Sequence, residues 1–291
     1  MNKSIKEALT SNKTESIIPA IKRLSFSGSL ADLPELLGVL KKTKNSEVKK
    51  EGNSAACAII KNNLLDNYND LDKNVRDKLG MLLESLDPDI IKEISKDIYS
   101  KAASRRVRAV QILGLLRKNP GTKNILFQLL KNRDEKVRAT AVQLLGDFIN
   151  PEKDLESIMN ALRDSDTRVR ANTIEALEKL GNPRLLPVFK RFIKDPSNRV
   201  RGNVLKAIHS LGDTDIEEYL LEMIESNNLL MKASGLWTAG ATGKFTERII
   251  DDAAYYLLSR NTMVRINARK MLKDCTSQRS RGYLRYLDIL E

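Results

Sequence analysis

The side chains that most often carry catalysis or bind metal ions are scarce in this chain. Its 291 residues include one histidine, His209, and two cysteines, Cys57 and Cys275. Zinc and iron sites usually draw on several histidines or on clustered thiolates, so the sequence predicts no metal and no cofactor. The two cysteines lie far apart and form no CxxC pair. That pattern argues against a disulfide framework and favours a reducing compartment, so we expect the cytoplasm.

One loop, residues 238–245 (TAGATGKF), has the glycines and the lysine of a phosphate-binding loop. It lacks the first glycine of that motif and the hydroxyl residue after Lys244, and no strand-like segment precedes it. We therefore expect no nucleotide site. With no pair of titratable residues at a catalytic spacing, the sequence predicts that the protein is not an enzyme.

The charge of the chain points to an acidic partner. Fifty Lys and Arg oppose 38 Asp and Glu, for a net charge of +12, and nearly all of the excess lies in residues 101–291. Such a balance favours a nucleic acid, an anionic lipid surface or an acidic protein as partner. No apolar run is long enough to span a membrane. The first residues show no apolar leader, so we expect neither a membrane span nor secretion.

A short phrase repeats along the chain with a period of about 31 residues. It begins at Val107, Val137, Val169, Val200 and Met231, each followed by Arg or Lys and then by a small residue. Counted from this anchor residue, apolar side chains return at +5 and +8, which places them on one helix face. A Pro or Gly break divides each unit, so each unit reads as two helices. Asp or Ser before the anchor is suited to cap the helix, and Gly181 and Gly212 are suited to end it.

Two-helix units of this length cannot bury their apolar stripes alone, so they must stack. We therefore predict an all-α fold, a right-handed α-solenoid of about seven or eight two-helix repeats. The pattern Asp-x-x-Val-Arg-x-x-Ala resembles the HEAT-repeat family, and in particular its short bacterial, phycobilisome-lyase-type repeats. The expected organisation is one continuous solenoid. It has an N-terminal cap segment (1–29) with one helix at Glu15–Ser25, irregular repeats (30–99), regular repeats (100–274) and a C-terminal capping helix (275–291).

The resemblance implies a structural role for the repeated arginines. In HEAT proteins this arginine typically bonds the turn aspartate of a neighbouring repeat, which makes a ladder along the stack. In this chain that ladder would consist of Arg108, Asp134, Arg138, Asp164, Arg170, Asp195 and Arg201.

Four further arginines flank the starts of the same helices: Arg105, Arg106, Arg168 and Arg199. They predict a basic rim that could bind an anion or a nucleic acid. The low aromatic share, 5%, argues against single-strand binding and leaves backbone contacts to a duplex open.

Positions +3 and +6 are expected to point away from the core, toward the concave face. The residues there that predict a partner-binding surface are Gln143, Asn172, Glu175, Asn203, Lys206 and Trp237. Trp237 stands in a column of polar residues, and exposed aromatics are enriched at binding hot spots. The alternative is that Trp237 packs under the loop that follows it, residues 241–245.

These features predict a non-catalytic scaffold or adaptor that binds a protein or peptide partner on its concave face, and the charge favours an acidic partner. The alternative is a nucleic-acid-binding solenoid that uses the basic rim in residues 101–291. A third reading, implied only by the resemblance, is a bilin-lyase or isomerase-like chaperone. Helical-repeat DNA glycosylases share the architecture, but the aromatic cluster that they use is missing here. The oligomeric state is not predicted.

Overall fold

The protein is described from a computed structural model that covers residues 3–11 and 13–290. In those residues every regular element is a helix, and no strand is formed. The chain divides into two compact units, residues 1–144 and 145–291, and each unit is treated separately below. The result confirms the predicted all-α solenoid fold.

The first unit begins with helices that pack around one long central helix, α4 (Ser46–Asn67), which contacts α2, α3, α5 and α7. The expectation of a single helix in residues 1–29 is wrong, because both α1 and α2 precede residue 28. The remaining elements of this unit are α1 (Lys3–Leu9), α2 (Thr14–Ser27), η1 (Leu30–Asp32), α3 (Leu33–Lys42), α5 (Lys73–Leu86), α6 (Ile90–Asp97), α7 (Ala103–Leu113), α8 (Pro120–Leu129) and α9 (Glu135–Leu145).

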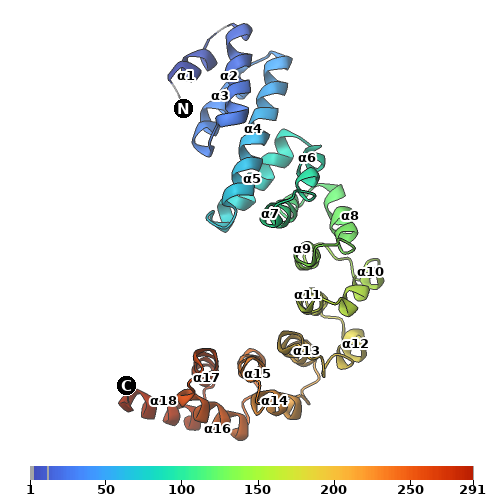
Figure 1. The fold of residues 1–291 in the computed structure, drawn as a ribbon, viewed down its shortest axis with the longest axis vertical. Helices are drawn as coiled ribbons and strands as arrows, with labels where there is room; N and C mark the ends of the chain where they lie inside the picture. Colours follow the sequence, from blue (N-terminus) through green and yellow to red (C-terminus); the bar gives the residue numbers. More distant parts are fainter. Residues whose placement is uncertain (1–2, 12, 291) are drawn as a thin grey trace. The chain divides into compact units, whose positions relative to one another are not determined.

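The second unit alternates short outer helices with longer inner helices. The inner helices α11, α13, α15 and α17 pack side by side in chain order (Figure 1). They are α11 (Thr167–Glu178), α13 (Asn198–Ser210), α15 (Leu229–Thr242) and α17 (Thr262–Asp274). The outer elements are α10 (Leu155–Met159), η2 (Asn160–Arg163), η3 (Pro183–Leu185), α12 (Leu186–Lys190), α14 (Glu217–Ile224), α16 (Glu247–Tyr255) and η4 (Tyr256–Leu258), and α18 (Gln278–Leu290) follows.

The repeat pattern explains where the inner helices begin and what they bury. Asp166, Ser197, Asn228 and Asn261 each accept a hydrogen bond from the backbone N–H of the repeat's anchor residue, Val169, Val200, Met231 or Val264, and so cap the helix that follows. The +5 residues Ile112, Val142, Ile174, Leu205 and Leu236 are all buried. Gly181 and Gly212 adopt positive φ angles of 59° and 95°, as expected for glycines that follow a helix.

The small residue at +2 allows the next inner helix to approach closely. A Cβ atom added to Gly202 would lie 2.8 Å from Oγ1 of Thr238 on α15, closer than real Cβ contacts. The C-terminal helix α18 carries Tyr283, Leu284, Leu287 and Leu290 at helical spacing, and the first two of these side chains are described. Tyr283 donates a hydrogen bond to Oδ1 of Asp251 (2.8 Å) and Leu284 is half-buried, whereas the side chains of Leu287 and Leu290 lie outside the described residues.

Candidate protein-binding surface

Four of the six residues expected to contact a partner line one cavity on the inner layer of the second unit. Glu175 on α11, Asn203 and Lys206 on α13, and Trp237 on α15 surround a space of about 490 Å³. The neighbouring Glu178 and Lys179 line it as well. Gln143 is exposed on α9 in the first unit, and Asn172 is buried on α11. The +6 column of this unit is therefore a surface with a recess, formed by three successive inner helices.

Trp237 is the aromatic residue of this surface. Its side chain is 39% exposed, so the loop that follows α15 does not cover it fully. It also lines a smaller cavity of about 70 Å³, together with Gly240 and Ala241 of its own helix and Lys270 of α17. An indole ring that borders two recesses offers a large apolar contact area at low cost in side-chain entropy.

Ionic contacts hold the polar side chains of this surface in place. Nζ of Lys206 lies 2.9 Å from Oε2 of Glu178, and Nη2 of Arg199 lies 3.5 Å from Oε1 of Glu175. Each pair joins α13 to α11. The charges of the α11–α13 surface are therefore largely matched to one another, and Trp237 is the apolar group beside them.

The expectation that the +3 position faces the partner is wrong for Asn172 and Asn203. Both side chains are buried, at 7% and 5% exposure. Nδ2 of Asn203 donates to the carbonyl oxygen of Ala171 (3.2 Å) and to Oε1 of Glu175 (2.7 Å), while Oδ1 of Asn172 accepts from Nη2 of Arg199 (2.7 Å). Adjacent inner helices approach so closely that a polar +3 side chain is enclosed between them and must find a partner there.

Another asparagine at +3 makes the same connection as Asn203 and escaped the sequence analysis. Asn267, at +3 in α17, donates from Nδ2 to the carbonyl oxygen of Ala233 (2.8 Å), the contact that Asn203 makes to Ala171. The recurrence of Asn at +3 in three repeats was the available signal. Asn203 and Asn267 each tie their inner helix to the one before it, whereas Asn172 is bonded to Arg199 on the helix that follows.

At Arg170 the arginine ladder has the expected geometry. Nε and Nη2 of Arg170 donate to Oδ2 and Oδ1 of Asp195 in the next repeat, both at 2.9 Å, and Nη1 donates to the carbonyl oxygens of Asp164 and Ser165. Its hydrogen bonds to Asp195 also raise the pKa of Arg170. Arg138 makes the corresponding backbone contacts, to the carbonyl oxygens of Asn132 and Arg133.

Two predicted ladder arginines have other partners. Arg201 lies 3.0 Å from Oε1 of Glu222, because the position that holds Asp195 in its own repeat is Ser226 in the next. Arg108 donates instead to the carbonyl oxygens of Leu65 and Asp66, at the end of α4. Which arginine forms a rung therefore depends on the residue that the next repeat supplies.

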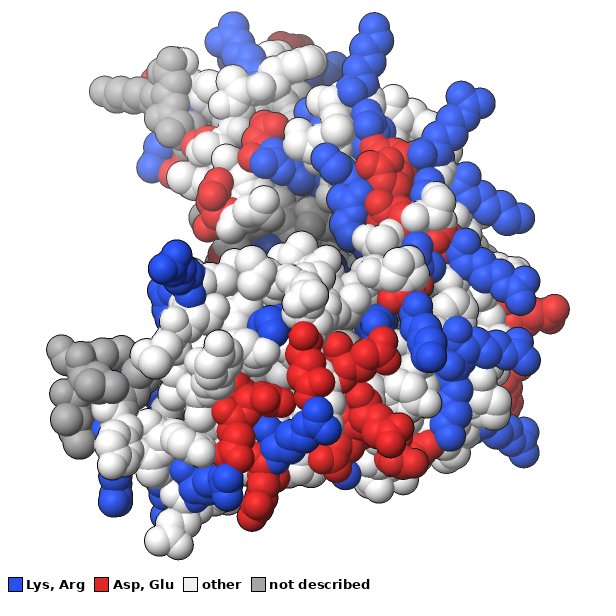
Figure 2. Space-filling view, turned by 60° about the horizontal axis from the view of Figure 1, so that its bottom comes forward, with Lys and Arg blue, Asp and Glu red and all other residues white. Residues whose placement is uncertain are grey.

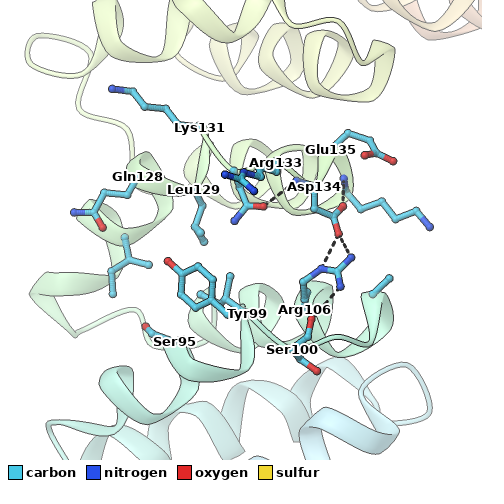
Figure 3. A pocket seen from close by; sticks show the side chains of 15 residues that line it. Ser95, Tyr99, Ser100, Arg106, Gln128, Leu129, Lys131, Arg133, Asp134 and Glu135 are labelled. Carbon is cyan, nitrogen blue, oxygen red and sulfur yellow. Dashed lines mark hydrogen bonds and ion pairs between the residues drawn. The ribbon is translucent and has the colours of Figure 1, made fainter.

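In the first unit, Arg106 occupies the structural position that Arg138 and Arg170 occupy in theirs. Nη1 of Arg106 donates to the carbonyl oxygens of Ser100 and Lys101, six and five residues earlier, as in those repeats. Nε of Arg106 donates to Oδ2 of Asp134 at 2.8 Å (Figure 3). Burial would raise the pKa of Asp134, but the hydrogen bonds from Arg106 and from the backbone bring it below its usual value.

The other three arginines of the predicted rim also have polar partners. Arg105 pairs with Asp97 (2.8 Å), Arg168 pairs with Asp166 (2.8 Å), and Arg199 bonds Asn172 as described above. The hydrogen bond from Arg168 lowers the pKa of Asp166. Any anion that bound this rim would have to compete with these contacts.

A recess in the first unit was not foreseen from the sequence. It measures about 1000 Å³ and lies between the α6–α7 and α8–α9 turns, with Tyr99 on one side and Leu129 and Arg133 on the other (Figure 3). Tyr99 belongs to no repeated position, so the periodicity gave no signal for it. The recess is open to solvent. The ion pair on its wall, between Arg106 and Asp134, joins two successive turns and so has a structural role.

Within residues 3–11 and 13–290, no group of three or more His, Cys, Asp or Glu side chains is arranged to hold a metal ion. The same residues contain no helix both long enough and apolar enough to cross a membrane.

Part of the second unit resembles a known repeat family. Residues 155–240 match the family model described as HEAT repeats. No curated protein matches the sequence.

Among solved structures, that of Kap121p bound to Pho4p is 15% identical, with a TM-score of 0.52 over 99% of this chain and 39% of that chain. The complex of CpcE and CpcF of phycocyanin lyase from Nostoc sp. PCC7120 is 17% identical, with a TM-score of 0.46 over 79% of this chain and 94% of that chain. The first similarity shows the fold alone. With the family match and the repeated contacts described above, it confirms the resemblance: this chain is an all-α solenoid, and its residues 155–240 match the model for HEAT repeats.

Proposed function

We propose that this protein is a non-catalytic scaffold that binds a protein or peptide partner on the inner layer of its second unit. The observation that carries the proposal is the half-exposed Trp237 at the edge of the 490 Å³ cavity, next to Lys206 and Glu178. Large aromatic side chains at the rim of a recess contribute more to protein association than their number suggests.

The surroundings of Trp237 suit a peptide better than a small reactive substrate. The nearby charges pair with each other across α11 and α13, so they are held rigidly and can exchange hydrogen bonds with a partner's backbone. A solenoid of similar fold, Kap121p, is described in complex with another protein, Pho4p, so such a fold can present a surface to a protein. The excess of basic residues favours a partner with acidic side chains.

The test is capture of partners from native extract by the immobilised protein. Trp237→Ala combined with Lys206→Ala should abolish capture of the proteins that the unchanged chain retains. Phe26→Ala is the matched control, because Phe26 is an exposed aromatic residue on α2 of the first unit. Equal capture by the double variant and by the control, at unchanged melting temperatures, would exclude this surface.

The alternative function is nucleic-acid binding through the basic rim, and it is a weaker proposal. All four rim arginines already have a carboxylate partner. Gel shifts of duplex DNA and RNA at low salt test it, since phosphate contacts weaken steeply with salt. Retention that disappears when Arg105, Arg106, Arg168 and Arg199 are replaced by Gln would support it.

A lyase or isomerase activity has no observation in its favour beyond the shared architecture. The cytoplasm is the compartment we propose, which is supported by the two cysteines, both buried and free.

A further inference from the structure

The second unit has an edge at which every outer element ends and every inner helix begins. We call this edge the turn rim and define it as the four turns 163–167, 191–198, 225–229 and 258–262. Contacts between successive turns keep them in order along the edge. Arg170 at the start of α11 bonds Asp195 in the next turn, and Lys232 at the start of α15 bonds Tyr256, just before the last.

The first two turns of the rim carry free positive charge. Arg163, Arg191 and Lys194 are exposed, and no carboxylate among the described residues forms an ion pair with them. The carboxylates of these turns, such as Asp166 and Asp195, are already bonded to Arg168 and Arg170. This half of the rim therefore attracts anions.

The last two turns carry apolar residues at three of the four equivalent positions of the repeat, and the fourth is Glu225, which pairs with Arg248. The position six residues before the anchor is Arg163 and Lys194 in the first two turns, and Glu225 and Leu258 in the last two. One residue before the anchor, Arg168 and Arg199 give way to Leu230 and Met263. The rim thus changes from cationic to apolar along the unit, and a further exposed cation, Arg260, lies within the apolar part.

These apolar side chains project into solvent. Leu258 is 75% exposed, Leu230 63% and Met263 55%, and Leu229 beside them is exposed as well. Single exposed leucines are common, but several on neighbouring turns mark an interaction surface. None of the four lines any of the recesses described above, so they do not form part of those recesses.

Cations beside projecting apolar side chains are the combination that binds the surface of an anionic membrane. We propose that the turn rim docks on an anionic lipid surface. Leu229, Leu230, Leu258 and Met263 enter the boundary between headgroups and acyl chains, while Arg163, Arg191, Lys194 and Arg260 meet headgroup phosphates.

The outer face of the same unit restricts the orientation of docking. Glu218 and Glu222 on α14 and Glu247 on α16 are exposed there, and acidic side chains gather over these outer helices in Figure 2. An anionic surface would repel this face, so the rim rather than the outer layer must approach the lipid. A nucleic acid would gain no binding energy from the exposed leucines. Replacing these leucines therefore distinguishes lipid binding from nucleic-acid binding.

The experiment is co-sedimentation of the full chain with vesicles of phosphatidylcholine, alone or with about one third phosphatidylserine. Binding is expected to the anionic vesicles only, and it should weaken as salt is added. The double variant Leu230→Ser/Met263→Ser should lower vesicle affinity more than about tenfold, because two apolar side chains that would enter the lipid are lost. The thermal transition should not move, since both side chains are exposed.

A second pair of variants tests the charge. In the double variant Arg163→Gln/Lys194→Gln, each substitution should lower the affinity for anionic vesicles about fivefold. Lys49→Gln with Lys50→Gln, two exposed lysines of α4 in the first unit, removes the same charge and should have little effect.

Three results would overturn the proposal. They are no binding to anionic vesicles, equal loss in the two charge variants, and full binding by the Leu230→Ser/Met263→Ser protein. Failure here leaves the proposed partner surface at Trp237 untouched, because that surface is tested with different residues and a different ligand.

Discussion

The rung between Arg170 and Asp195 is expected to be among the most valuable single contacts of the second unit. The Arg170 side chain is 13% exposed and that of Asp195 is 6% exposed, and two parallel hydrogen bonds of 2.9 Å join them. Arg170→Ala would leave the Asp195 carboxylate buried without its cation. Removing one partner of a buried pair costs about 3–5 kcal/mol.

Two comparisons sharpen that expectation. Arg168 also pairs with an aspartate, but its side chain is 41% exposed and its partner Asp166 lies only two residues away. Arg168→Ala should therefore cost about 1 kcal/mol or less. The double variant Arg170→Ala/Asp195→Ala should be more stable than the sum of the single variants predicts, with a coupling energy of about 2 kcal/mol.

The assay is urea unfolding of each variant, followed by circular dichroism, with the free energy of unfolding extrapolated to water. If Arg170→Ala cost no more than Arg168→Ala, burial of the rung would have no energetic consequence. The reasoning that assigns the repeated arginine a structural role would then be refuted.

Three further outcomes follow from the packing and the pKa shifts. Gly235→Ala should destabilise the protein by about 1–2 kcal/mol, because its Cβ would lie 2.9 Å from Met223 and 3.0 Å from a backbone nitrogen. Gly240→Ala on the same helix would make only ordinary contacts and should stabilise the protein by about 0.5–1 kcal/mol, and thermal melts of the two variants test the difference. Burial raises the pKa of Cys57 to about 12, so a thiol reagent at mildly alkaline pH should label this residue only after unfolding, and rapid labelling of the native protein would contradict its buried position. The pKa of Asp166 is lowered in the folded state by its hydrogen bond to Arg168, so its stabilising contribution is complete above the unfolded-state pKa and disappears as the pH falls through the folded-state value; Asp166→Asn should flatten the fall in stability below about pH 4.

Some of the candidate site could be predicted because it follows the helical period. Glu175, Lys206 and Trp237 lie at +6, opposite the apolar +5 and +8 residues, and the structure brings them to one cavity. The prediction failed at +3. A polar residue in the sequence can lie either on an exposed face or in the contact between two packed helices, and Asn203 lies in that contact.

The recess beside Tyr99 and the apolar end of the turn rim could not be predicted in the same way. Tyr99 has no counterpart in other repeats, and Leu230 and Met263 look in the sequence like ordinary apolar residues at the start of a helix. Their exposure depends on where the neighbouring turn lies, which the sequence pattern does not specify.

By itself the sequence determined the helices, their caps and the stacking of two-helix units, because a period of about 31 residues with buried +5 positions has one physical solution. The tertiary structure alone decided the partners of the polar edge residues. A rung forms at Arg170 because the next repeat supplies Asp195, whereas Arg201 meets Ser226 at that position and pairs with Glu222 instead. Apolar periodicity is a property of one helix, but an ion pair is a property of two helices in a particular register.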